Sequence, residues 1–186
     1  YVINASSEPD GTVTNGMSYH ARDGRNANSA MLASVSFDNP QKGLDFQRKL
    51  EQTAFRLGNG KAPSSLLKDF LNDNTSKSFG HIKPTFLPGT EFCDFNTLFP
   101  KSVSDMLKTG LTEFGKRIYS DGQAVLTGVE TRTSAPLRIL RNPQTLESVG
   151  CAGLYPCGEG AGYSGGITSS AVDGIKVAEA ILERNI

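Results

Sequence analysis

Tryptophan is absent from this sequence, and histidine and cysteine are scarce, with two and three copies among 186 residues. The cysteines, Cys93, Cys151 and Cys157, have no Cys-x-x-Cys spacing and do not make a disulfide framework. Such usage fits a reducing, cytoplasmic setting. His20 and His81 are too few for a metal site, which requires three or four ligands, and no His/Cys/Asp cluster has suitable spacing. We therefore expect no metal ion.

An excess of one charge and long apolar runs are also missing. Lys and Arg together number 19, as do Asp and Glu, so the chain lacks the basic excess of a nucleic-acid-binding protein. No run approaches the roughly 18 apolar residues of a membrane span. No Gly-x-Ser-x-Gly elbow occurs, which argues against a serine hydrolase. These absences predict neither a nucleic-acid partner nor a membrane partner.

The first part of the chain is typical of β structure. Asn15-Gly16 lies between two extended runs, which predicts a hairpin turn. Residues 31–37 alternate between apolar and other side chains, the pattern of a half-buried strand. The polar loop 22–28 has two interpretations, a solvated connection or a segment that faces a ligand.

The middle of the chain, about residues 38–122, is interpreted as an inserted helical lobe. An apolar helical face ends at Gly58, and Pro63 is expected to open a second helix. A capping box at residues 102–105 precedes a helix whose apolar stripe, expected to be core, runs from Val103 to Ile118. Between these helices, residues 72–100 show little periodicity, and we expect an irregular cap.

The last part of the chain alternates strand and helix signals. Strands are expected at 124–126, 129–133 and 137–140, followed by a closing helix. One face of that helix carries five apolar residues, namely Ile167, Ala171, Ile175, Ala178 and Leu182. Strands, then a helical insertion, then strands and a helix predict the α+β class.

Residues 153–167, Gly-Leu-Tyr-Pro-Cys-Gly-Glu-Gly-Ala-Gly-Tyr-Ser-Gly-Gly-Ile, carry the strongest functional signal. They read as a short buried strand, a glycine-rich turn and the start of the closing helix. Glycines let a backbone approach a ligand closely, and a helix N-terminus favours an anion. The lone carboxylate, Glu159, suits a ligand rich in hydroxyl groups. The alternative is a tight turn without a ligand, with Cys157 as a small buried hydrophobe.

This segment resembles the C-terminal flavin-contacting segment of two-dinucleotide-binding-domain flavoproteins, and more narrowly the uncharacterised prokaryotic FAD-dependent dehydrogenase family. Three further segments match that pattern in the right order, at residues 15–30, 126–139 and 171–180. The resemblance implies an FAD-dependent oxidoreductase, a dehydrogenase of unknown substrate, with NAD(P)H as a candidate electron donor. FAD and a small-molecule substrate would be its partners.

The resemblance also implies which residues bind the cofactor. They are Gly158, Glu159, Gly160, Ala161, Gly162, Gly165, Gly166 and Ile167. The first three would contact the ribityl-pyrophosphate part of FAD. Gly165, Gly166 and Ile167 would lie near the pyrimidine edge of the isoalloxazine ring, where the helix N-terminus stabilises negative charge on the reduced flavin.

On the substrate side the candidates are Arg132, Thr133, Arg22 and Asn28, and no catalytic residue is identified. Arg132 is either an exposed arginine at a sheet edge or an anion-binding group, since guanidinium matches carboxylate or phosphate bidentately. We favour Arg132 over Arg138, which alternates with apolar neighbours and is expected to point to solvent.

A complete member of that family carries a Gly-x-Gly-x-x-Gly Rossmann fingerprint near its N-terminus. No such motif follows a strand here, and the chain begins with Tyr1. We expect a C-terminal fragment that is inactive without the N-terminal Rossmann half. Residues 1–145 would form a β-rich substrate-side and cap domain, and 146–186 the strand-loop-helix edge of the FAD-binding domain. The alternative is a non-catalytic ligand- or protein-binding module that retains a flavoprotein-like fold.

Overall fold

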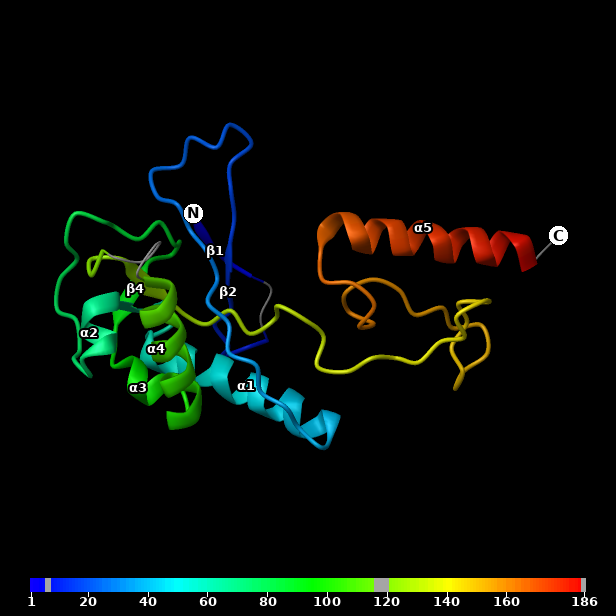
Figure 1. Ribbon diagram of the computed structural model, residues 1–186, viewed down its shortest axis with the longest axis horizontal. Helices are drawn as coiled ribbons and strands as arrows, with labels where there is room; N and C mark the ends of the chain where they lie inside the picture. The colour runs from blue at the N-terminus through cyan, green and yellow to red at the C-terminus, as the bar shows by residue number, and fades with distance from the viewer. Residues whose placement is uncertain (6–7, 116–120, 185–186) are drawn as a thin grey trace. The chain divides into compact units, whose positions relative to one another are not determined.

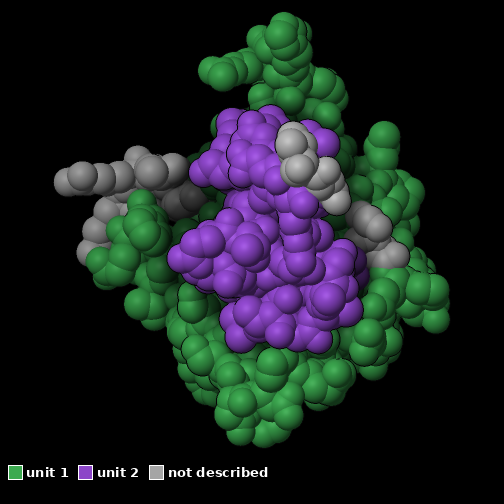
Figure 2. All heavy atoms as spheres, turned by 90° about the vertical axis from the view of Figure 1, so that its right-hand side faces the viewer, with its two compact units in different colours: residues 1–131 green, residues 132–186 purple. Residues whose placement is uncertain are grey.

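The computed structural model describes residues 1–5, 8–115 and 121–184. It divides into two compact units, residues 1–131 and residues 132–186 (Figure 2). Helices and strands both occur along the chain, so the predicted α+β class is confirmed at that level (Figure 1). No described helix has the length and the apolar character that crossing a membrane requires.

A three-stranded sheet lies at the centre of the first unit. Its middle strand β3 (Ala62–Leu66) pairs in parallel with β4 (Thr90–Phe92) and antiparallel with β5 (Val125–Thr127). All five residues of β3 are buried. The prediction that Pro63 opens a helix is therefore wrong. Pro63 lacks an N–H group but still joins the sheet, because its carbonyl accepts the N–H of Gly128 at 3.0 Å.

A second, two-stranded sheet joins β1 (Val2–Asn4) to β2 (Thr14–Gly16) in antiparallel register. The predicted turn at Asn15-Gly16 is wrong, because both residues lie inside β2, and the connection falls before Thr14. The Thr14 N–H donates to the Val129 carbonyl at 2.8 Å, which holds this segment extended. The strand predicted at 31–37 is also wrong, because these residues form neither strand nor helix.

Helix α1 (Pro40–Leu57) confirms the helix expected to end at Gly58. Asn39 is its N-cap and accepts the Gln41 N–H at 2.8 Å, and Pro40 occupies the first turn, where its missing N–H costs nothing. Glycine is required after the helix, because a Cβ at Gly58 would meet the backbone of Lys61.

Three further helices follow, namely α2 (Leu67–Leu71), α3 (Phe95–Leu98) and α4 (Lys101–Gly115). The helix expected behind residues 102–105 is confirmed as α4, but the capping box is wrong. The helix begins at Lys101, and the Pro100 carbonyl accepts the N–H groups of Val103 and Ser104.

The predicted core stripe of α4 holds only in part. Val103 and Leu111 are 6% and 4% exposed, whereas Met106 and Phe114 are 43% and 58% exposed. Ile118 lies outside the described residues. The helix contributes its inward face to the core and leaves the other two side chains at the surface.

The core of the first unit is a cluster of side chains from the helices and strands around β3. Its buried members are Ala54, Leu67, Phe70, Cys93, Phe95, Leu98, Leu111 and Val129. The rings of Phe70 and Phe95 meet edge to face at 5.8 Å. Burial raises the pKa of the Cys93 thiol to about 12, so this cysteine packs as a hydrophobe and is not a nucleophile.

In the described part of the second unit, helix α5 (Ile167–Arg184) confirms the predicted closing helix. The strands predicted at 129–133, at 137–140 and ahead of the glycine-rich turn are wrong. Within the described part of residues 132–184, β pairing is confined to an isolated bridge between Arg141 and Ser148.

The predicted apolar face of α5 points outward. Ile167, Ile175 and Leu182 are 89%, 59% and 65% exposed, while Val177, on the opposite side, is 5% exposed. The helix therefore packs on the loops of its own unit through a narrower strip that includes Asp173. The described residues of its own unit leave its broad apolar face uncovered.

Candidate functional site

The glycine-rich loop of residues 158–166, called the glycine loop below, precedes α5 and has an open outer side. A Cβ added at Gly160 or Gly165 would meet no heavy atom within 4 Å. The Glu159 side chain and Gly166 are exposed next to them. Ile167, the first residue of α5, is 89% exposed although it is apolar. This side can accept a ligand against bare backbone, one carboxylate and one apolar side chain.

The inner side of the loop is tightly folded. Gly158 and Gly162 have φ values of +70° and +83°, in the left-handed region that glycine adopts readily. A Cβ at Gly162 would lie 2.7 Å from the Leu137 carbonyl oxygen. The Gly162 N–H donates to the Glu159 carbonyl at 2.9 Å, and the Tyr163 N–H donates to the Gly158 carbonyl at 3.0 Å. These two glycines are required by the turn itself.

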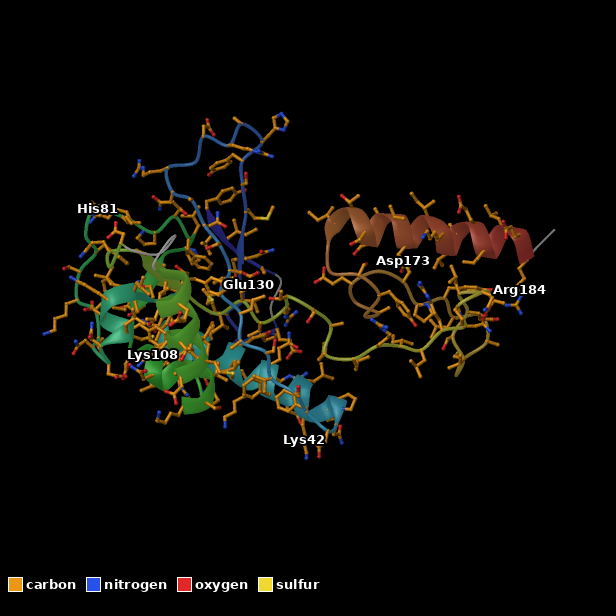
Figure 3. The ribbon with its side chains drawn as sticks, in the orientation of Figure 1. Lys42, His81, Lys108, Glu130, Asp173 and Arg184 are labelled. Atoms are coloured by element: carbon orange, nitrogen blue, oxygen red, sulfur yellow. The ribbon has the colours of Figure 1, made fainter. Side chains whose placement is uncertain are left out.

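A partly buried ion pair joins Arg141 to Asp173, which Figure 3 labels on α5, and it lies against the start of the loop. Arg141 Nη2 donates to Asp173 Oδ1 at 2.6 Å, and Nη1 donates to Oδ2 at 3.0 Å and to the Pro156 carbonyl at 2.7 Å. The Gly158 N–H donates to the same Oδ2 at 2.9 Å. The hydrogen bond from Arg141 lowers the pKa of the Asp173 carboxyl, desolvation opposes this, and the Gly158 N–H adds to the lowering.

Tyr163 completes this network. Its hydroxyl donates to the Ile139 carbonyl at 3.1 Å and accepts the Arg141 backbone N–H at 3.0 Å. The guanidinium of Arg141 lies 3.8 Å from the ring centroid, and that of Arg138 lies 5.0 Å away. Arg138 is exposed as predicted, but it does not simply point to solvent, because its Nε donates to the Gly162 carbonyl at 2.7 Å.

The N-terminus of α5 is joined to the loop by serines. The hydroxyls of Ser164 and Ser170 lie 2.8 Å apart, and the Ser170 N–H donates to the Gly166 carbonyl at 2.9 Å. The preceding N–H groups, of residues 167–169, have no carbonyl within the helix to accept them. Together with the helix dipole, they make this end of α5 favourable for negative charge.

The substrate-side candidates lie in different units. Arg132 and Thr133 are exposed at the start of the second unit. Arg22 and Asn28 are exposed in the first unit, where Asn28 donates to the Met17 carbonyl at 2.9 Å. Arg132 and Thr133 are neighbours in the second unit, whereas Arg22 and Asn28 lie in the first unit.

The residues predicted to bind the cofactor fall into two groups. Glu159, Gly160, Gly165, Gly166 and Ile167 are exposed on the outer side, whereas Gly158 and Ala161 are buried and Gly162 is partly buried. The interpretation of Cys157 as a buried hydrophobe is wrong, because its side chain is exposed.

Sequence reasoning missed the roles of Arg141, Asp173 and Tyr163. One signal was present, since Asp173 is a carboxylate in the second turn of a helix whose neighbours are small or apolar. Its arginine partner lies 32 positions away, so spacing could not have identified the pair. A metal centre is not indicated, because no group of three or more His, Cys, Asp or Glu side chains within the described part of the chain could hold an ion.

Comparisons with known proteins add two findings. A family model described as "FAD-dependent protein, C-terminal domain-like" matches residues 1–133. An uncharacterised protein of Clostridium beijerinckii is 50% identical over 192 residues, a match that covers 98% of this chain and 36% of that relative. The chain therefore spans about a third of the length of this relative.

Proposed function

Because the chain belongs to the FAD-dependent protein, C-terminal domain-like family, we propose that it is the C-terminal part of an FAD-dependent oxidoreductase. In this proposal residues 1–145 form the substrate-side and cap domain, and residues 146–186 complete the FAD-binding domain. A Rossmann half elsewhere in a longer parent polypeptide holds the rest of the cofactor. The short share of the relative that the chain covers supports this arrangement.

The open outer side of the glycine loop is the observation that supports FAD most directly. Gly160 and Gly165 leave space in which a ligand can touch the backbone. Exposed Glu159 suits the hydroxyl groups of the ribityl chain, and exposed Ile167 suits the flat apolar ring. Gly158, Ala161 and Gly162 shape the turn from within. Bound FAD would supply hydride chemistry, here a dehydrogenase reaction.

The chain's own groups have distinct tasks in this site. The N-terminus of α5 stabilises negative charge on the reduced ring. Arg132, with Thr133 beside it, binds an anionic group of the substrate, since a guanidinium pairs bidentately with carboxylate or phosphate. Arg22 and Asn28, in the first unit, are further candidates for contact with the substrate. This 186-residue chain alone does not retain FAD, because partial contacts forfeit binding energy while the association cost remains.

A visible absorption spectrum of the purified parent polypeptide tests the function. We expect flavin bands that bleach when NADH, NADPH or dithionite is added, and the reductant that acts identifies the electron donor. A folded, colourless parent that cannot be reconstituted with FAD would overturn the proposal. That result would favour a binding module in which the glycine loop is only a turn.

A further inference from the structure

We propose that Asp173 is a positioning residue that fixes the glycine loop in its ligand-binding form, acting through Arg141 and the Gly158 amide. The identity of the ligand, FAD, rests on the proposed function; the ordering of the loop does not. Asp173 lies in the second turn of α5, and its carboxylate accepts three donors from this chain. It therefore acts on the loop and not on the ligand.

The carboxylate connects segments that are far apart in the sequence. It accepts hydrogen bonds from both terminal nitrogens of Arg141, at 2.6 and 3.0 Å, and from the Gly158 N–H at 2.9 Å. Arg141 in turn donates to the Pro156 carbonyl at 2.7 Å, two residues before the loop. Helix, loop entry and the preceding segment are thus held by one charged centre.

The burial of this pair distinguishes it from an ordinary surface ion pair. The side chains of Arg141 and Asp173 are 9% and 14% exposed. Exposed ion pairs contribute little to stability, but removing one partner of a desolvated pair leaves a charge without compensation. The Tyr163 ring, 3.8 Å from the guanidinium, further fixes the orientation of Arg141. Loss of the Asp173 carboxylate therefore perturbs the segment that it holds.

The loop requires this support because its glycines are permissive. Gly158 and Gly162 adopt positive φ, and glycine reaches other conformations at little cost. Bonding of the Gly158 N–H to Asp173 selects one orientation of that peptide and leaves the outer side to Gly160 and Gly165. A loop that is ordered beforehand binds a ligand more tightly, because the ligand does not have to order it.

Two readouts test the role of Asp173 in an Asp173→Ala variant. In the 186-residue chain, we expect the Gly158 amide proton to exchange with solvent about tenfold faster or more. In the parent polypeptide, we expect the dissociation constant of FAD to rise about tenfold or more. Asp173→Asn keeps an acceptor for Gly158 but loses the charge, and both of its effects should be intermediate. If the alanine variant does not fold, the asparagine variant decides.

Arg184→Gln is the matched control, because Arg184 forms a carboxylate–guanidinium pair with Glu147 at the far end of α5. It should leave loop exchange and FAD retention unchanged. Unchanged Gly158 exchange in the Asp173 variants overturns the proposal, and so does faster exchange with normal FAD binding. Faster exchange in a parent that binds no flavin at all supports the ordering of the loop and refutes the choice of FAD.

Discussion

The glycines of the loop differ in whether their positions have room for a side chain, and this difference provides a test of the site. Gly165 has no heavy atom within 4 Å of an added Cβ and is not in the left-handed region, so Gly165→Ala should leave the fold intact. The added methyl group occupies the outer space proposed for FAD. We expect the parent's FAD dissociation constant to rise roughly tenfold, a loss of about 1.4 kcal/mol, measured by titration of flavin fluorescence.

Gly150 is the control for that substitution, because its Cβ position is equally open and it lies outside the glycine loop. Gly150→Ala should bind FAD like the unmodified parent. If both alanine variants bind FAD normally, the outer side of the loop does not contact the cofactor.

Glu130 is a half-buried carboxylate in the first unit whose ionisation affects stability (Figure 3). Desolvation raises the pKa of Glu130, and the Gly16 N–H that it accepts opposes the rise in part. Because the pKa of Glu130 is higher in the folded state, the protonated carboxyl stabilises the fold. This stabilisation is fully present below the pKa of about 4.3 in the unfolded chain, and it is lost as the pH rises through the pKa in the folded state.

Glu130→Gln removes this dependence. The glutamine variant should be more stable than the unmodified chain, and the difference in free energy of unfolding should be larger at pH 7 than at pH 4. Urea unfolding at both pH values measures this difference. A difference that is the same at both pH values would show that ionisation of Glu130 does not affect stability.

At the scale of elements, helices were predicted better than strands. The apolar helical face that ends at Gly58 and the closing helix were both predicted correctly, because residues that are close in the sequence show the helical period. Strand β3 was missed because its stability comes from β4 and β5, whose paired residues lie 28 and about 60 positions later in the sequence. The Asn15-Gly16 turn signal was overridden by the bond between Thr14 and Val129.

The N-cap of α1 is an element-scale feature whose contribution can be measured. The Asn39 side chain accepts the Gln41 N–H, so Asn39→Ala leaves one N–H group at the helix start without its protein acceptor. We expect the free energy of unfolding to fall by about 1 kcal/mol in a urea titration. Lys49→Ala, at an exposed position in the same helix, should change it by less than about 0.5 kcal/mol. Equal effects would mean that the cap does not stabilise the helix.

At the scale of the whole molecule, the sequence predicted the location of the glycine loop but not what orders it. The loop was visible as a cluster of glycines before a helix, a local pattern. The pairing of Arg141 with Asp173, and the stacking of both Arg138 and Arg141 on Tyr163, depend on how distant segments fold together. The outward direction of the apolar face of α5 was equally hidden, because periodicity identifies a face and not what covers it.

That open face yields a prediction about the parent polypeptide. Ile175 and Leu182 are 59% and 65% exposed here, and the chain spans 36% of the Clostridium beijerinckii relative. If the proposed remainder of the parent packs on α5, these side chains become buried there. Ile175→Glu should then leave the unfolding of the 186-residue chain nearly unchanged but destabilise the parent by about 2–3 kcal/mol, since it places a charge in an apolar interface. Glu179→Gln, at an exposed position of the same helix, is the control, and a parent that tolerates both variants equally would show that the face stays uncovered.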